Sequence, residues 1–196
     1  MFVAEAPGYS EDRTGSLFVG EVGALFDELL ASISLRRDQV YVTSVVKCRP
    51  PRNRASHREE VLQCEGYLYR QIALVRPQLI CTMGGPATKL LTGLGGRFVD
   101  MRGQVLSCVV QGRSVAVLPM YHPAAAMYVG DLLGDLRSDM LAIPALVRGA
   151  VEGVTEGLLG SQISIESAPG KLAVGIGVDT ATEDDACGNQ LSFELS

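Results

Sequence analysis

VAEAPGYSEDRTGSLFVG, residues 3–20, is the stretch on which the interpretation of this sequence depends. It continues a short apolar segment, residues 2–4, and turns at Pro7 and Gly8, which predicts a strand that runs into a loop. The rest of the stretch contains two further glycines and scattered acidic residues, and we expect it to form neither a helix nor a strand. A chain that places such a segment directly after its first strand is expected to use it as a binding pocket.

Outside this stretch, strand patterns and helix patterns alternate along the chain. Apolar residues recur at helical spacing in residues 21–34, and residues 39–46 are rich in β-branched and aromatic residues, which predicts a helix and then a buried strand. The remaining predicted elements are a helix at 58–75, a strand at 78–85, a short helix at 86–92, strands at 104–110 and 114–119, and a helix from about 130 to 148. This alternation indicates an α/β layered fold with a mostly parallel sheet.

The least regular loops all follow predicted strands. They are residues 5–20, 47–54, 84–86 and 121–126. Because ligands bind beyond the carboxyl ends of the strands in sheets of this kind, we expect the four loops to converge on one edge and to form the site there.

The 196 residues, of which 47% are hydrophobic, suffice for one domain with a substantial core. We place that domain at residues 1–150 and interpret residues 151–196 as an acidic tail of low order. The tail has eight acidic residues and one lysine, whereas residues 1–150 have 16 basic and 14 acidic residues, a net charge of +2. Such a balance is compatible with a nucleic-acid partner but does not indicate one by itself.

The sequence also bears on the compartment. No apolar run approaches the roughly 18 residues that a bilayer span needs, and no basic region precedes an apolar segment at the start, as it does in a signal peptide. Five irregularly spaced cysteines do not form the framework of a secreted disulfide-rich protein. We therefore expect a cytoplasmic protein without membrane contact.

Four segments at predicted strand ends together resemble the family 4 uracil-DNA glycosylases, the iron–sulfur-cluster type. They are EAPGYSEDRTGSLFVGEVGALFDELL (5–30), VYVTSVVKCRPPRNRASHREEVLQCEGYL (40–68), LICTMGGPA (79–87) and YHPAAAM (121–127). The similarity covers roughly residues 2–145. It implies a three-layer α/β/α sandwich around a mostly parallel four-stranded sheet, and hydrolysis of the N-glycosidic bond of uracil in DNA. We expect uracil-containing DNA as the partner and a monomer as the functional form.

The resemblance implies three catalytic residues, Glu5, Glu11 and His122. Cleavage of the glycosidic bond builds positive charge on the deoxyribose and negative charge on the departing uracil, so the enzyme has to stabilise both. His122, next to Pro123, matches the residue that donates a hydrogen bond to uracil O2. Glu5 and Glu11 match candidates for holding the attacking water or countering the sugar charge. Simple solvation is the alternative for each carboxylate.

The flipped base needs a shaped pocket. Ala6, Pro7 and Gly8 match the first motif of the family, in which the proline stiffens the loop and the glycine lets the backbone approach the base. Phe18 matches the aromatic residue that stacks on the base. The alternative for Phe18 is a core position at the start of the next helix.

Ser44 departs from the family pattern, in which an Asn usually stands four residues before the cysteine of KCRPP. An amide both donates and accepts, so it can pair with uracil O4 and N3, whereas a serine makes one adaptable contact. Loss of such a two-point readout costs about 1–3 kcal/mol of discrimination. The resemblance therefore leaves the base selectivity of this chain open.

A basic cluster, Lys47, Arg49, Arg52 and Arg54, lies in the same predicted loop and suits phosphate contacts. Asn53, within it, matches a polar family residue near the DNA. A solvated loop is the alternative for the cluster. The second histidine, His57, has no such context, and we interpret it as a solvated residue at a helix start.

Cys48 and Cys64 have the spacing of the second half of the family's four-cysteine site for a [4Fe–4S] cluster. The first half is a Cys-x-x-Cys pair upstream of the first strand, and this chain begins too late to contain it. Either a front segment is missing or this version holds no complete cluster. We favour a missing segment and expect a protein of residues 1–196 alone to be colourless.

Three alternatives to a uracil-DNA glycosylase remain. The chain could be a catalytically impaired DNA-binding relative, or a glycosylase for another deaminated base such as hypoxanthine. Ser44 and the incomplete cysteine set motivate both. A generic nucleotide-binding domain is the third, but the sequence contains no phosphate-loop motif.

Overall fold

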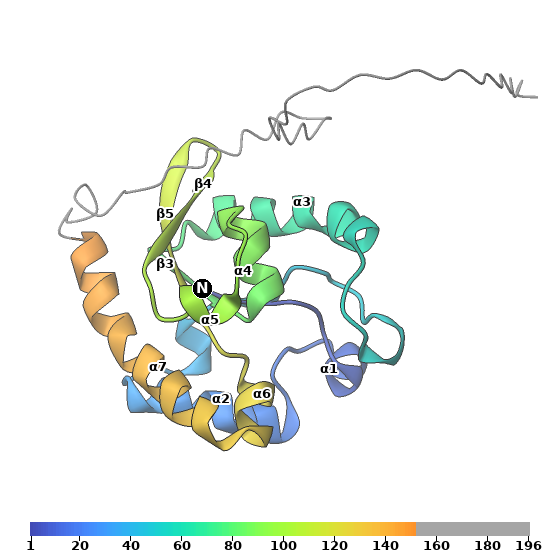
Figure 1. The fold of residues 1–196 in the computed structure, drawn as a ribbon, viewed down its shortest axis with the longest axis horizontal. Coiled ribbons are helices and arrows are strands. Elements are labelled where there is room, and N and C mark those ends of the chain that lie inside the picture. Colours follow the sequence, from blue (N-terminus) through green and yellow to red (C-terminus); the bar gives the residue numbers. More distant parts are fainter. Residues whose placement is uncertain (152–196) are drawn as a thin grey trace, which may run out of the picture.

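The computed structural model describes residues 1–151, so all of the predicted tail beyond Val151 lies outside the described residues (Figure 1). Within them, a mixed sheet has the strand order β2-β1-β3-β5-β4. The strands are β1 (Phe2–Ala4), β2 (Val42–Ser44), β3 (Leu79–Met83), β4 (Leu106–Val110) and β5 (Arg113–Met120). All neighbouring pairs are parallel except β4 and β5. The α/β class with a mostly parallel sheet is confirmed. The sheet has five strands rather than the four that the resemblance implies, because β4, predicted at 104–110, forms an antiparallel hairpin with β5.

Helices cover both faces of this sheet, which gives the three layers visible in Figure 1. One layer contains α2 (Gly20–Ser32), α6 (Pro123–Tyr128) and α7 (Gly130–Val151), and the other contains α3 (Arg58–Val75) and α4 (Gly85–Thr92). The side chains of β1 alternate between the two cores: Phe2 and Ala4 pack under the first layer and Val3 under the second. This alternation follows from the two-residue period of a strand.

Short helices also occur where none was predicted. They are α1 (Tyr9–Thr14), α5 (Phe98–Met101), α6 within the predicted loop at 121–126, and the 3-10 turns η1 (Arg37–Gln39) and η2 (Pro51–Asn53). The expectation that residues 5–20 contain no helix is therefore wrong. A glycine precedes α1, and Gly15 ends it in the left-handed conformation at φ 71°. Six residues between two glycines are too few to give a readable helical period.

The carboxyl ends of the parallel strands lie together, as expected. Ala4 pairs with Ser44, and Met83 pairs with Met120, so that β1 and β2 end level with each other, as do β3 and β5. Further backbone bonds extend these pairings into the loops, from Val46 N–H to the Glu5 carbonyl and from Gly84 N–H to the Met120 carbonyl, both at 2.9 Å. The segments that begin at residues 5, 45, 84 and 121 therefore leave the sheet at the same edge.

Within the described residues, no helix is both long enough and apolar enough to cross a membrane.

Candidate active site at the carboxyl edge of the sheet

His122 follows β5 and forms the N-cap of α6. Its Nδ1 atom accepts the N–H of Ala124 at 3.1 Å. A nitrogen that accepts carries no proton, so the neutral ring has its proton on Nε2. Burial lowers the pKa of His122, and the nearby Glu11 and Glu5 oppose that shift without reversing it. His122 is therefore a neutral imidazole at pH 7 with a donor at Nε2.

Phe18 lies next to His122. The two ring centroids are 5.4 Å apart, and on its other side the Phe18 ring packs 4.6 Å from that of Phe26. Only 1% of Phe18 is exposed. Phe18 thus occupies a core position as well as a position beside His122, and its stacking on a base stays a prediction.

The two glutamates differ in what holds them. Both oxygens of Glu11 accept backbone N–H groups, from Gly8 at 2.6 Å and from Phe18 at 2.5 Å. Glu5 accepts one bond, from the Ser56 N–H to Oε1 at 2.7 Å, and its Oε2 has no hydrogen-bond partner among the described residues. Glu11 therefore braces the loop, whereas Glu5 keeps an oxygen for a ligand.

The predicted backbone motif lies in the same loop. Pro7 is buried, and Ala6 and Gly8 are half-buried. A Cβ atom at Gly8 would meet the Glu11 carboxylate at 3.3 Å, which is a tight contact. The glycine therefore lets the carboxylate reach the Gly8 N–H.

Ser44 is the last residue of β2 and is 4% exposed. Its hydroxyl donates to the Val46 carbonyl at 2.8 Å, so only its lone pairs remain for a ligand. Ser44, Pro7 and Glu11 line a cavity of about 460 Å³. Phe18 and His122 do not line this cavity. Glu11 connects the cavity with Phe18 and His122. Its carboxylate lines the cavity, accepts the Phe18 N–H, and by its charge opposes the lowering of the His122 pKa.

Lys47 points into the protein rather than toward a phosphate-binding surface. Its ammonium donates to Thr43 Oγ1 at 2.9 Å, to Gln71 Oε1 at 2.8 Å and to the Ser44 carbonyl. Burial lowers the pKa of Lys47 to about 8. The structure thus places Lys47 in the wall of the cavity and differs here from the expected phosphate contact.

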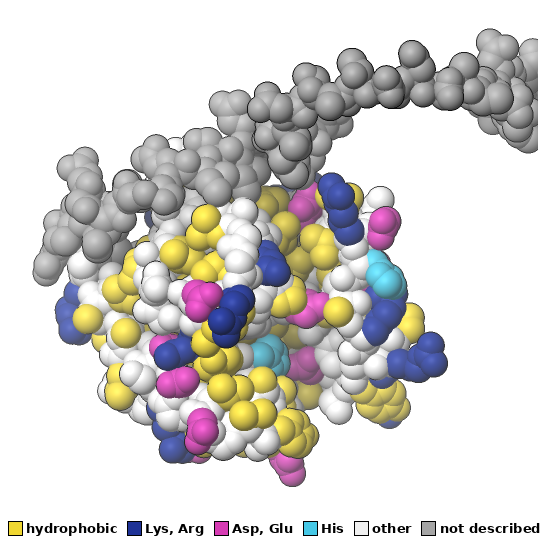
Figure 2. Space-filling model, viewed as in Figure 1, with side chains coloured by type: hydrophobic (Ala, Val, Ile, Leu, Met, Phe, Trp, Pro, Cys, Tyr) yellow, Lys and Arg dark blue, Asp and Glu magenta, His cyan; other side chains and the backbone are white. Residues whose placement is uncertain are grey.

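The other members of the basic cluster lie before α3. Arg49 donates to Asn53 Oδ1 at 2.6 Å and stacks 4.8 Å over the ring of Tyr9. Arg54 makes a two-bond ion pair with Glu60, which lowers the pKa of that carboxyl to about 2. Arg52 is exposed. In Figure 2, basic side chains gather along the right edge, and a histidine and acidic side chains lie along a hollow in the middle of this face.

The cysteines do not provide a complete cluster site within the described residues. Cys48 is exposed and Cys64 is half-buried. Cys81 and Cys108 are buried in the sheet, and burial raises the pKa of each thiol to about 12, which disfavours the thiolate that binds iron. No group of three or more His, Cys, Asp or Glu residues within residues 1–151 could hold a metal. Two candidate thiolates do not fit a [4Fe–4S] cluster, which takes four, so the cluster stays a prediction from the resemblance.

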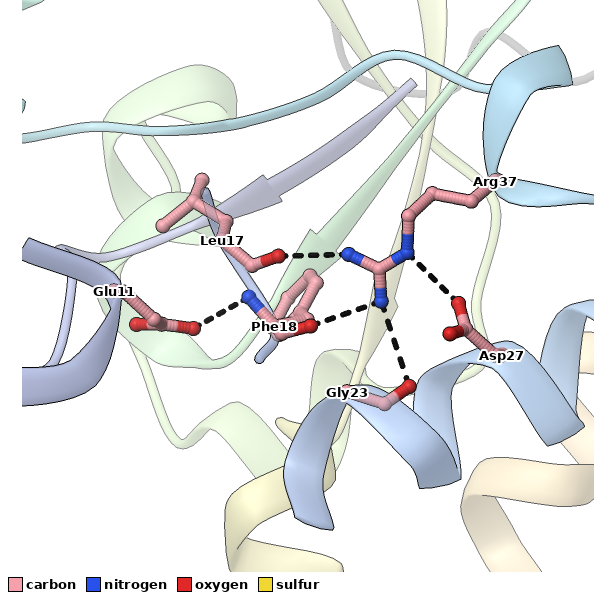
Figure 3. Close-up of polar contacts among 6 residues, drawn as sticks. All are labelled: Glu11, Leu17, Phe18, Gly23, Asp27 and Arg37. Carbon is pink, nitrogen blue, oxygen red and sulfur yellow. Dashed lines mark hydrogen bonds and ion pairs between the residues drawn. The ribbon is translucent and has the colours of Figure 1, made fainter. Parts of the chain in front are cut away.

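Sequence reasoning missed two residues that hold the site. The Ser56 backbone fixes Glu5, and the Arg37 guanidinium binds the carbonyls of Leu17 and Phe18 (Figure 3). No motif marks either residue, since the partners are 19 to 51 positions apart in the sequence.

Comparisons with known proteins identify the family of this chain. Residues 1–141 match the family described as the uracil DNA glycosylase superfamily. The chain is 43% identical over 133 residues to the type-4 uracil-DNA glycosylase of Sulfurisphaera tokodaii, an alignment that covers 65% of this chain and 60% of that protein. Its identity to the type-4 uracil-DNA glycosylases of Archaeoglobus fulgidus and Pyrobaculum aerophilum is 44% in each case, over 66% and 67% of their lengths. The chain thus spans about 60 to 67% of the length of these relatives.

Proposed function

The chain belongs to the uracil DNA glycosylase superfamily, and from that premise we propose that it removes uracil from DNA by hydrolysing the N-glycosidic bond, the opening step of base-excision repair. The names of the three relatives support uracil in DNA as the substrate. The resemblance to family 4 rests on the same residues that form the edge of the sheet.

One juxtaposition carries the proposal: a neutral imidazole, an aromatic ring and two carboxylates meet beyond the strand ends. Phe18 and His122 are in contact, and Glu11 and Glu5 both act on the charge state of that histidine. Glycosidic cleavage needs a donor for the leaving base and negative charge for the sugar, which His122 and Glu5 can supply.

In this mechanism His122 stabilises the leaving group. With Nδ1 occupied by the Ala124 N–H, the Nε2–H is available to donate to uracil O2. As the bond from C1′ to N1 breaks, negative charge grows on the base and the hydrogen bond strengthens. A fixed donor of this kind is worth about 10²- to 10³-fold in rate.

Glu5 serves the sugar side. Its Oε2 accepts a proton from the water that attacks C1′, and its charge offsets that of the sugar. The Ser56 N–H fixes the other oxygen and so orients the carboxylate. Glu11 acts through the loop, because both of its oxygens already bind backbone groups.

Arg49 and Arg52 contact phosphates of the DNA near the flipped nucleotide. Both precede α3 at the edge where the loops converge, and the Arg54 charge beside them is satisfied by Glu60. Contacts to phosphates position the strand without reading sequence.

Ser44 favours a second candidate, a glycosylase with a different choice of deaminated base. A hydroxyl whose proton is bound to the Val46 carbonyl can accept from uracil N3 but gives nothing to O4. The same acceptor suits the N1–H of hypoxanthine. Base choice is thus less restricted than with an amide at this position.

An excision assay on one set of oligonucleotides tests both candidates. Strands that contain a single uracil, hypoxanthine or xanthine are incubated with the protein and then cleaved with alkali. Cleavage at uracil alone supports the main proposal, and cleavage at hypoxanthine supports the second. Intact strands in every case, with DNA binding retained, would mean that the chemistry is lost.

A further inference from the structure

Phe18 is held in an unusual backbone conformation. Its φ is 53°, in the left-handed region that side-chain-bearing residues avoid. Such a conformation persists only where the surrounding structure fixes it. The contacts around residue 18 therefore explain why the ring of Phe18 lies against His122.

The peptide groups on both sides of Phe18 are bound by charged side chains. The carboxylate of Glu11 accepts the Phe18 N–H, and the guanidinium of Arg37 donates to the Phe18 carbonyl at 2.9 Å (Figure 3). Arg37 also donates to the Leu17 carbonyl at 2.7 Å. A carboxylate on the donor side and a guanidinium on the acceptor side together fix the orientation of residue 18.

Glu11 and Arg37 thus form a clamp on the backbone of Phe18, and the first turns of α2 complete it. A Cβ atom at Gly23 would lie 2.2 Å from the Phe18 carbonyl oxygen, so only glycine lets the helix approach so closely. The Arg37 guanidinium also donates to the Gly23 carbonyl at 3.4 Å and forms an ion pair with Asp27 at 2.8 Å. The planar fork of the guanidinium thereby joins four groups, which a lysine ammonium could not match in geometry.

We propose that Arg37 is a positioning residue for glycosidic cleavage, which fixes the backbone of Phe18 so that its ring and His122 form one base-binding surface. This inference rests on the proposed function. In this proposal Arg37 acts through the backbone of Phe18 and not through a contact of its own with the base. It would thus affect how productively a flipped base is held rather than how tightly the DNA strand is bound.

The test compares Arg37→Met and Arg37→Lys with a matched control, Arg36→Met. Arg36 is the neighbouring arginine, but its side chain pairs with Asp38 and is 72% exposed. Single-turnover uracil excision should fall about 10- to 100-fold in both Arg37 variants and stay unchanged in the control. A strand with a tetrahydrofuran abasic site offers no base, so its affinity for the Arg37 variants should differ less than about twofold from its affinity for wild type. Unchanged excision in Arg37→Lys and Arg37→Met would overturn the proposal.

A double-mutant cycle separates positioning from general destabilisation. In a Phe18→Ala background, Arg37→Met should lower the excision rate no further, because its effect passes through the ring. An additional loss equal to that in the wild-type background would overturn the proposal. Asp27→Asn, which removes one Arg37 contact, is a milder variant should Arg37→Met fold poorly, and it should show a smaller loss in the same direction.

Amide hydrogen exchange gives a readout that needs no activity. Residues 15–20 should exchange faster in Arg37→Met than in wild type and in Arg36→Met. Equal exchange in all three proteins would contradict the clamp itself. A wild-type protein that excises no uracil would contradict the proposed function, and with it the role in cleavage, whatever the exchange result.

Discussion

The Nδ1 atom of His122 accepts the backbone N–H of Ala124 at 3.1 Å. This contact caps α6 and also fixes which ring nitrogen carries the proton. Protonation of Nδ1 would remove the acceptor, so the structural role and the chemical role of His122 both require the neutral ring.

The stability of the protein should therefore depend on pH through His122. Burial lowers its folded-state pKa below the ordinary value of 6.5, so the unfolded chain takes up a proton first as the pH falls. The stabilising contribution is complete above about pH 6.5 and is lost as the pH falls through the folded-state pKa. Urea unfolding between pH 7.5 and 5.5 measures this loss. The His122→Asn variant, which keeps a capping side chain without a titrating group, should show a smaller decline. Equal declines would assign the effect to other groups.

Glu5 and Glu11 should respond differently to conversion to glutamine. Glu11→Gln replaces one of two oxygens that bind backbone N–H groups, so the free energy of unfolding should fall by about 1–3 kcal/mol. Glu5→Gln keeps an oxygen for the Ser56 N–H and should change stability little. The rate of uracil excision should fall by about 10²-fold or more, because an amide cannot act as the general base that takes a proton from the attacking water. Denaturant melts and single-turnover rates on both variants check this. Loss of stability in Glu5→Gln together with loss of excision in Glu11→Gln would contradict this assignment.

Ser44→Asn should sharpen base choice. It replaces a hydroxyl bound to Val46 with an amide that donates and accepts at the cavity wall. Discrimination between uracil and hypoxanthine should change by about 1–3 kcal/mol, a factor of roughly 5 to 150 in the ratio of kcat/KM values. Ser44→Ala is the control, since it removes the hydroxyl and adds no readout. If Ser44→Asn and Ser44→Ala gave the same ratio, residue 44 would not face the base.

Arg52 and Arg54 form a matched pair for the DNA contact. Arg52 is exposed, whereas Arg54 is engaged by Glu60 through two bonds. Arg52→Gln should weaken binding to all DNA sequences alike. The slope of log K against the logarithm of the salt concentration should become smaller in magnitude by about one. Arg54→Gln should leave that slope close to the wild-type value. Titrations at several salt concentrations measure both, and a larger slope change in Arg54→Gln would contradict the assignment.

The regular elements of this fold could be predicted from the sequence because their signals are local. Glu59 and Glu60 mark the first turn of a helix, and the range predicted for it, 58–75, is the one that α3 has in the structure. Apolar runs predict β1 at its observed bounds, and they predict β3 at 78–85, whereas the strand itself spans Leu79–Met83. The helix α1 could not be predicted, because Glu11, within the helix, stabilises it through a contact with the Gly8 N–H rather than through an apolar face.

The site could be predicted only in part. His122, Phe18 and Glu5 belong to segments that resemble a known family, and the structure brings Phe18 and His122 into contact. The inward turn of Lys47 depends on Gln71, 24 residues away on α3, and the support from Arg37 depends on a turn 19 residues beyond Phe18. Contacts of this kind arise from tertiary packing and leave no pattern in the chain.

The role of His122 as the donor to the departing base can be decided by a single comparison: release of uracil from a single-stranded oligonucleotide, under single-turnover conditions, by wild type and by His122→Asn. Asn at residue 122 keeps an acceptor for the Ala124 N–H, so α6 should stay capped and the melting temperature unchanged. Wild type should release uracil, and the variant should do so about 10²- to 10³-fold more slowly with similar affinity for the strand. Release at equal rates by the two proteins would show that the imidazole takes no part in breaking the bond.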